Sequence, residues 1–225
     1  MQPMDVEPVH CPLCGTDGAG PFHRDERREF LRCKTCQLVF VPARFHLSLV
    51  DERAEYDLHE NSPGDTGYRR FLNRLLEPLV SHLEPTSTGL DFGCGPGPTL
   101  SVMFEESGHS VALFDPFYAA DESTLQRQYD FVTASEVVEH FREPRRFLDQ
   151  MWCCVRPGGW LGIMTKRVLD DSAFATWHYK DDLTHVSFFS EATFGWLADV
   201  WSAELNIIGP DVVLLRKTAL TNSAS

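Results

Sequence analysis

Four cysteines near the N-terminus have the type and spacing of a metal site. They form two Cys-x-x-Cys pairs, Cys11 with Cys14 and Cys33 with Cys36. Each short turn brings two sulfurs to one ion, and four thiolates complete a tetrahedron around Zn²⁺. Since all four protein ligands are cysteines and no coordination position stays open, we predict a structural zinc. A redox Cys-x-x-Cys pair or a chance spacing is the alternative.

A second group of residues could carry acid–base or metal chemistry. Glu136, Glu139 and His140 lie at i, i+3 and i+4, which predicts that they share one face at the start of a helix. Two carboxylates and an imidazole on one face can hold a hard divalent cation such as Mg²⁺ or Mn²⁺. We count all three as catalytic candidates. The alternative is that Glu136 only contacts a cofactor, while the other two have structural roles.

The segment from Trp177 to Ser190 mixes aromatic residues with aspartate and histidine. It follows an apolar run, and ligands bind at the carboxyl edge of an open parallel sheet. This composition predicts a substrate pocket rather than a surface loop. His185 is the candidate general base because imidazole takes up a proton near neutral pH. A buried histidine that fixes the loop by hydrogen bonds is the alternative. The candidate substrate contacts in this segment are Trp177, Tyr179 and Asp182.

A glycine-rich turn, LDFGCGPG, occupies residues 90–97 and precedes a helical pattern. Its glycines permit a tight turn and let a ligand reach backbone N–H groups at the helix N-terminus. The turn alone is weak evidence, since dinucleotide-binding folds use a similar device. Asp115 ends the next apolar run, where its carboxylate can accept hydrogen bonds from both hydroxyls of a ribose. A further run ends at Ser135, at the same expected edge of the sheet.

These residues need a framework of alternating strands and helices to bring them together. Such an alternation predicts an α/β fold whose parallel sheet is covered on both faces. A closing hairpin is expected over 205–217, around Gly209 and Pro210. The expected strands are 88–92, 110–115, 129–135 and 160–165, the last after a turn at 157–159, and the expected helices are 68–83, 98–107, 144–155 and 190–200.

The chain divides into parts of different character. We expect a zinc ribbon over residues 1–45 and the α/β domain over 68–217, with a tail at 218–225. Residues 46–67 are polar, acidic and interrupted by proline and glycine, which predicts a linker or a lid. As a lid, this segment would bring Tyr56 and His59 to the substrate.

The composition restricts the partners. The formal net charge is −13, which disfavours a grip on long nucleic acid and favours a small-molecule partner. No apolar stretch is long enough to span a membrane, and residues 1–10 lack the features of a signal peptide, so a cytoplasmic location is expected. One basic run could form a local patch, although a solvated face is the simpler interpretation. It consists of Arg24, Arg27, Arg28, Arg32 and Lys34.

In combination, the motifs LDFGCGPG, FDP, SEVVEH and RPGGWLGIM resemble those of class I S-adenosylmethionine (SAM) dependent methyltransferases. The likeness covers residues 68–217 and implies a Rossmann-like sheet with SAM as the cofactor. It implies that Asp115 binds the ribose and that Phe117 and Ser135 lie near the adenine. The cofactor contacts implied in the glycine-rich loop are Asp91, Gly93, Cys94, Gly95 and Gly97. RCKTCQLVFVP resembles the zinc ribbon that precedes some methyltransferase domains.

The Glu-x-x-Glu-His pattern is similar to a metal site of ubiquinone-pathway O-methyltransferases and small-RNA 2′-O-methyltransferases. In the latter a downstream histidine completes the site, and His185 could take that place. The chain departs from the family after Asp115, because a helix and a strand usually occupy the region of residues 116–129. We therefore expect a sheet of six strands, with an adenine pocket built differently.

The resemblance implies methyl transfer from SAM to a small-molecule acceptor. An RNA methyltransferase is the second hypothesis, since a zinc ribbon also precedes this fold in one group of enzymes that modify ribosomal RNA. The third hypothesis is a degenerate SAM-binding domain whose zinc ribbon docks a protein partner.

Overall fold

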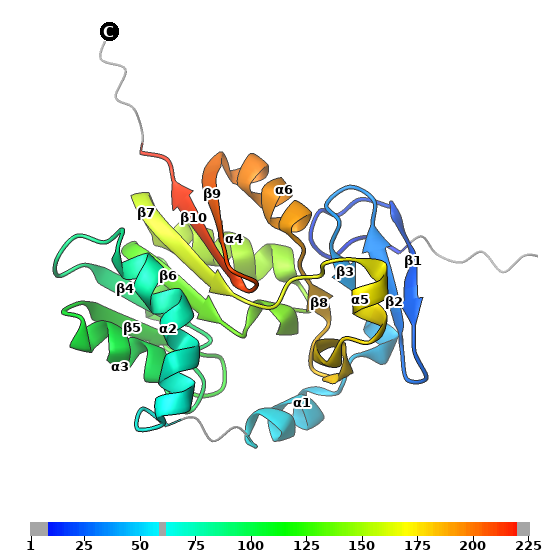
Figure 1. Ribbon diagram of the computed structural model, residues 1–225, viewed down its shortest axis with the longest axis horizontal. Coiled ribbons are helices and arrows are strands. Elements are labelled where there is room, and N and C mark those ends of the chain that lie inside the picture. The colour runs from blue at the N-terminus through cyan, green and yellow to red at the C-terminus, as the bar shows by residue number, and fades with distance from the viewer. Residues whose placement is uncertain (1–8, 59–61, 220–225) are drawn as a thin grey trace, which may run out of the picture.

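A computed structural model describes residues 9–58 and 62–219, and its centre is a mixed sheet of six strands (Figure 1). The order is β5-β4-β6-β7-β10-β9, with the first four strands parallel and β10 antiparallel to both neighbours. The prediction of six strands is confirmed. The strands are β4 (Thr88–Phe92), β5 (Ser110–Phe114), β6 (Tyr129–Ser135), β7 (Val155–Met164), β9 (Ala203–Ile208) and β10 (Val212–Lys217).

Helices cover both faces of this sheet, as the alternating pattern predicts. Helices α2 (Thr66–Val80) and α3 (Thr99–Glu106) bury a leucine-rich stripe against one face, where Phe131, Trp160 and Leu214 point. Helices α4 (Pro144–Cys154) and α6 (Glu191–Trp201) cover the opposite face, lined by Val132 and Ile163. Consecutive strand residues therefore belong to different apolar cores, which the period of a strand requires.

Local signals in the sequence explain where these helices begin. Asp65 accepts hydrogen bonds from Gly67 N and Tyr68 N at the start of α2, and Pro144 occupies the first turn of α4. Ser190 forms a capping box with Thr193 at the start of α6. β7 begins at Val155, earlier than the expected strand. Gly158, at φ +84°, lies inside this strand rather than in a separate turn.

The region after Asp115 contains no strand and no α-helix before β6. A bridge joins Asp115 to Ala119, and a 3₁₀ turn, η2 (Glu122–Gln126), completes the connection. β5 consequently lies at an edge of the sheet. The short connection thus lacks the strand and the helix that the resemblance stated above would place there.

A second, smaller sheet joins the N-terminal module to a strand much further along the chain. Its order is β1-β2-β3-β8, all antiparallel, and β8 comes from the segment that follows β7 (Figure 1). Phe30, Phe174 and Phe188 form the apolar cluster beside this sheet. The N-terminal module with the four cysteines therefore pairs, through β3, with the aromatic segment of residues 177–190. The domain boundaries at residues 45 and 67 stay a prediction. The remaining elements are β1 (Ala19–Arg24), β2 (Glu29–Cys33), β3 (Val39–Phe40), η1 (Ala43–Phe45), α5 (Asp171–Ala175), η4 (His178–Asp181) and β8 (Ser187–Phe188).

The segment expected to be an irregular linker contains a helix, α1 (Leu49–Tyr56). Ser48 caps its start by accepting a hydrogen bond from Asp51 N. Acidic residues in its first turn interact favourably with the positive end of the helix dipole and stabilise the helix. His59 lies outside the described residues. Among the helices of the described chain, none is long and apolar enough to cross a membrane.

Candidate functional site

The glycine-rich loop follows β4 and is held by Asp115 at the end of β5. Gly93 and Gly95 have left-handed backbones, with φ of +75° and +64°. The Asp115 carboxylate accepts hydrogen bonds from Gly95 N at 3.1 Å, Phe117 N at 2.8 Å and Tyr118 N at 3.1 Å. A carboxylate has about four acceptor positions, so about one remains for a ribose hydroxyl.

Burial shifts the pKa of two side chains at the glycine-rich loop, the Asp91 carboxyl and the Cys94 thiol. Asp91 is 4% exposed, and its carboxylate accepts a hydrogen bond from Thr133 Oγ1 at 2.9 Å. Burial raises the pKa of Asp91 to about 7, and burial beside Asp91 raises the pKa of the Cys94 thiol to about 12. Cys94 is therefore a neutral thiol at neutral pH. Gly97, at the other end of the loop, accepts a hydrogen bond from Thr99 N at 2.7 Å through its carbonyl oxygen, at the start of α3.

The two carboxylates beyond β6 do not lie on one face of an α-helix. Glu136 has a left-handed backbone at φ +52°, and only a 3₁₀ turn, η3 (Val138–His140), follows before α4. The expected helix start is therefore wrong at this position. Non-glycine residues with a left-handed backbone are uncommon, and they occur more often at functional sites than elsewhere.

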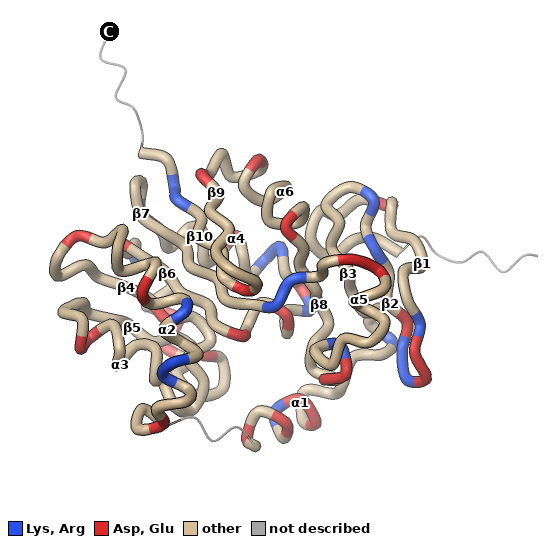
Figure 2. Tube along the Cα trace, in the orientation of Figure 1, with Lys and Arg blue, Asp and Glu red and all other residues tan. Residues whose placement is uncertain are grey.

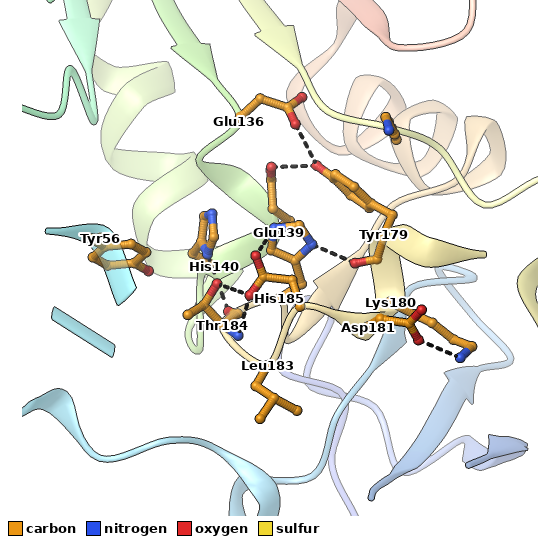
Figure 3. A network of polar contacts seen from close by, with 12 residues as sticks. Tyr56, Glu136, Glu139, His140, Tyr179, Lys180, Asp181, Leu183, Thr184 and His185 are labelled. Atoms are coloured by element: carbon orange, nitrogen blue, oxygen red, sulfur yellow. Dashed lines mark hydrogen bonds and ion pairs between the residues drawn. The ribbon is translucent and has the colours of Figure 1, made fainter. Parts of the chain in front are cut away.

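Tyr179 connects these two carboxylates (Figure 3). Its hydroxyl donates to Glu139 Oε1 and lies 3.4 Å from Glu136 Oε2, and Thr165 Oγ1 is 3.2 Å away. Burial raises the pKa of Glu136 to about 8, with Glu139 as the next cause, and burial also raises the pKa of Glu139. Two negative charges on Glu136 and Glu139 are therefore unfavourable in this buried place, and a bound cation would stabilise them.

Two histidines complete the cluster, and their ring centroids lie 4.7 Å apart. His185 Nδ1 lies 2.7 Å from the Tyr179 carbonyl oxygen, and His140 Nδ1 lies 3.3 Å from the Thr184 carbonyl oxygen. A carbonyl only accepts, so each Nδ1 donates and each neutral ring keeps its lone pair on Nε2. One ligand atom from each of Glu139, His140 and His185 lies within 4.8 Å of the other two.

The remaining candidates surround this cluster at different depths. The Tyr56 ring, on α1, lies 5.2 Å from the His140 ring and 5.9 Å from the Phe117 ring, so it bridges the glycine-rich side and the histidines. Asp182 Oδ2 lies 3.7 Å from His185 Nε2. Trp177 packs on the Tyr179 ring at 5.0 Å and on the Phe188 ring at 6.1 Å, in the aromatic cluster beside the smaller sheet.

One arginine of the basic run in the N-terminal module departs from the expected solvated face, while Arg24, Arg27 and Lys34 are exposed. At the tip of the β1–β2 hairpin, basic and acidic residues lie side by side (Figure 2). Arg24 pairs with Glu29 at 3.3 Å and Arg32 with Asp171 at 2.7 Å. Arg28 is 2% exposed and directs its guanidinium at the aromatic segment. The expectation of a solvated face is therefore wrong for Arg28, which had no distinguishing signal in a run of arginines.

The four cysteines converge as their spacing predicts. Cys11 Sγ lies 3.5 Å from Cys36 Sγ, and Cys14 Sγ lies 3.4 Å from Cys33 Sγ. All four sulfurs lie within 4.8 Å of one another, which suits one tetrahedral ion. The hydrogen bond between Cys11 and Cys36 lowers the pKa of the Cys11 thiol and raises that of Cys36, so Cys11 loses its proton first.

Comparison with known proteins identifies the domain that carries these residues. A family model described as a methyltransferase domain matches residues 63–207. The chain belongs to this methyltransferase family. No curated protein shows significant sequence similarity to it.

Solved structures share the fold of this methyltransferase. One is the 1,6-didemethyltoxoflavin-N1-methyltransferase of Burkholderia thailandensis with S-adenosylhomocysteine bound. It is 15% identical with a TM-score of 0.52, and the match covers 89% of this chain and 100% of that one. Another is the magnesium protoporphyrin IX methyltransferase of Synechocystis PCC 6803 with SAM bound. It is 12% identical with a TM-score of 0.51, covering 77% and 93% of the two chains. The Rossmann-like α/β class is thereby confirmed.

Proposed function

We propose that this methyltransferase transfers a methyl group from SAM to a small-molecule acceptor beside His185. The observation that carries the proposal is a set of buried polar atoms without hydrogen-bond partners among the described residues. Ser135 Oγ, Glu136 Oε1 and Glu139 Oε2 lie at the last residue of β6 and just after it, where Val137 lies against Gly93 of the glycine-rich loop. Such atoms are costly unless a ligand satisfies them, so their gathering supports a binding site.

The residues fit SAM in charge. The two left-handed glycines turn the loop, with Gly93 N donating to the Phe114 carbonyl oxygen and Gly95 N to Asp115, and Asp115 keeps about one acceptor position for a ribose hydroxyl. Ser135 would meet the adenine side, and Asp91 and Glu136 would face the cationic end of the cofactor. When bound, SAM supplies a methyl group on a positively charged sulfur, which the surrounding carboxylates favour.

His185 would serve as the base when the acceptor is a hydroxyl or another protonated nucleophile. Its Nε2 would take the acceptor proton, and SAM, when bound, would supply the methyl group that the acceptor receives. Asp182, at 3.7 Å, and Glu139 stabilise the imidazolium that results. Correct placement of the acceptor provides most of the rate increase in such an in-line displacement.

A small acceptor agrees better than RNA with the charges of the chain. The net charge is −13, and the arginines of the β1–β2 hairpin are paired with acidic groups or buried. The two structural neighbours above are named for methyl transfer to 1,6-didemethyltoxoflavin and to magnesium protoporphyrin IX, neither of which is a nucleic acid. The aromatic segment and Tyr56 would then enclose the acceptor.

We propose that the cysteine cluster holds a structural zinc. Four sulfurs take all positions of a tetrahedral ion, so no position remains for a substrate or water. The cluster lies at the base of the β1–β2 hairpin, where Ala19 pairs with Cys33. Zinc would therefore fix the hairpin rather than take part in methyl transfer.

A divalent cation at Glu139, His140 and His185 is a second candidate for the reacting centre. Both histidines donate Nδ1–H to backbone carbonyls, the usual support of metal-binding imidazoles. Two imidazoles and one carboxylate suit Mn²⁺ better than Mg²⁺. A bound ion would lower the pKa of an acceptor hydroxyl. Titration with Mn²⁺ tests this, and binding that His140→Ala does not weaken would contradict the site.

Calorimetry with SAM and with S-adenosylhomocysteine tests the cofactor proposal. Micromolar binding of both is expected, and absence of both would indicate a degenerate domain. A panel of hydroxyl- and amine-bearing heterocycles, with labelled SAM as the donor, then identifies the acceptor. His185→Ala should abolish turnover and leave cofactor affinity unchanged, with His23→Ala as the matched control outside the site. Salt-dependent retention on RNA, together with methylation of RNA, would instead favour the RNA methyltransferase.

A further inference from the structure

Arg28 occupies the tip of the β1–β2 hairpin, far in sequence from the reacting residues. The turn forms around Asp25, whose Oδ1 accepts hydrogen bonds from Arg27 N and Arg28 N, each at 2.8 Å. The Asp25 backbone N–H also bonds the Arg28 carbonyl oxygen at 3.1 Å. This tight turn fixes the direction in which the Arg28 side chain leaves the hairpin.

The Arg28 guanidinium reaches four backbone carbonyls of one segment. Nη1 lies 2.9 Å from the His185 carbonyl oxygen and 3.2 Å from that of Leu183. Nη2 lies 2.6 Å from the Asp182 carbonyl oxygen and also donates to that of Lys180. The planar fork of donors on arginine suits such a set of acceptors, whereas the single ammonium of lysine does not.

The segment that Arg28 holds carries the reacting side chains. Between Tyr179 and His185 the chain makes no long helix or strand, only the 3₁₀ turn η4 and a loop. Tyr179 presents both the hydroxyl that meets Glu139 and the carbonyl that meets His185 Nδ1. Loss of the fork would therefore release the groups that fix the tautomer of His185.

Because Arg28 is buried, its contact with the carbonyls of residues 180–185 favours one conformation of this segment over others. Arg28 is 2% exposed, and burying a guanidinium is costly unless hydrogen bonds compensate. The four carbonyls satisfy Nη1 and Nη2, whereas Nε has no hydrogen-bond partner among the described residues. Asp25 Oδ2, 3.8 Å from Lys180 Nζ, adds an ionic contact between the hairpin and the same segment. If the carbonyls moved away, a buried charge would lose most of its partners, so alternative loop positions are disfavoured.

We propose that Arg28 is a positioning residue through which the cysteine module fixes the segment that carries Tyr179, Asp182 and His185. The proposal rests on the proposed function, since His185 is the base there. The sulfur cluster lies at one end of the β1–β2 hairpin, with Cys33 closing β2, and Arg28 lies at the other end. The N-terminal module is thereby a structural part of the reacting centre and not a separate docking domain.

Hydrogen–deuterium exchange of the full chain tests this without an acceptor. Arg28→Ala should speed exchange in peptides from 178–186 by about tenfold or more, because the charged hydrogen bonds to four carbonyls of this segment are lost. Peptides from β4 and β6 should stay protected, and the affinity for S-adenosylhomocysteine should stay within about twofold, the scatter of local effects. Arg24→Ala is the matched control, since Arg24 makes only an exposed ion pair with Glu29.

Two further measurements separate positioning from general stability. In ¹⁵N spectra of the histidine rings, His185 should keep Nδ1–H in the wild type and become a tautomer mixture in Arg28→Ala. Methylguanidinium should restore protection of 178–186 in that variant, and methylammonium should not. If Arg28→Ala does not fold, Arg28→Lys is measured instead, with the same increase expected. Wild-type protection in either variant, or an equal increase throughout the chain, would overturn the proposal. Absent cofactor binding by the wild type would instead reject the proposed function.

Discussion

The Tyr179 carbonyl oxygen lies 2.7 Å from Nδ1 of His185, and the hydroxyl of the same tyrosine donates to Glu139. One residue therefore fixes the histidine tautomer through its backbone and contacts the buried carboxylate through its side chain. These two roles can be separated by mutation, because only the second needs the hydroxyl.

Tyr179→Phe should lower turnover by about tenfold or more, since a hydrogen bond to a charged group is worth about 1.5–3 kcal/mol. The His185 tautomer should not change, because the carbonyl is retained. Steady-state kinetics and ¹⁵N spectra of the histidines measure the two effects. Tyr118→Phe is the control, since its hydroxyl bonds Asp57 at 2.6 Å, outside this cluster. An altered tautomer in Tyr179→Phe, or full activity, would contradict the assignment.

Asp91 should make the protein without ligand less stable as the pH rises. Burial raises the pKa of Asp91 to about 7, whereas the unfolded chain has the usual value near 4. Between these values the folded state keeps a proton that the unfolded state loses, so the free energy of unfolding falls with rising pH. Relative to Asp91→Asn, the wild type should therefore lose stability from about pH 4 to 7 and change little above. Urea titrations across this range measure the difference, and a constant difference would refute the shift.

Glu136 should make the preference for SAM over S-adenosylhomocysteine depend on pH. Burial, with Glu139 nearby, raises the pKa of Glu136 to about 8, so the carboxyl becomes charged only above neutral pH. A charged carboxylate attracts the sulfonium of SAM but not the neutral sulfur of the product. The affinity ratio should rise about fivefold from pH 6 to 9, the effect of roughly 1 kcal/mol of charge–charge interaction.

Calorimetry on both ligands at each pH measures this ratio, in which the amino and carboxyl groups common to both ligands cancel. Glu136→Gln is the matched variant, since it keeps the shape and removes the charge. Its ratio should not vary with pH. An equal rise in this variant would assign the effect to another carboxyl.

Gly93 should tolerate no side chain, because a Cβ there would lie 2.5 Å from Val137 Cγ2 and the backbone has φ +75°. Gly93→Ala should cost about 2 kcal/mol or more of stability through overpacking and backbone strain, and should weaken cofactor binding. Gly95→Ala is the control for strain alone, since nothing lies within 4 Å of its Cβ. The double change Gly93→Ala with Val137→Ala should recover part of the loss. No recovery would show that backbone strain dominates.

The sequence predicts the parts of this molecule whose signals are local. Pro144 and Ser190 mark helix starts, and the two cysteine pairs indicate their own convergence. The strand count follows from the short connection after Asp115. Each of these features depends on residues close together in the chain, where spacing carries the information.

The contacts between distant segments were not predictable in this way. Arg28 is one of several arginines close together in sequence, and nothing local distinguishes it from the others. Only the tertiary fold directs its side chain at carbonyls of the segment ending at His185. β8 is two residues long and pairs with β3 across most of the chain. The left-handed backbone of Glu136 also breaks the expected helix face. Tertiary packing overrides local periodicity at these positions.

Removal of zinc should disturb the reacting segment as well as the N-terminus. Wild type and Cys153→Ser, which changes an exposed cysteine outside the cluster, should bind about one zinc ion per chain. Cys33→Ser should lose the ion, lower the melting temperature and increase hydrogen exchange in residues 178–188, because β3 of the same module pairs with β8. Metal analysis and exchange measurements test these outcomes. A metal-free preparation with a folded, protected N-terminus would show that sulfur packing alone holds the module, and the zinc proposal would then fail.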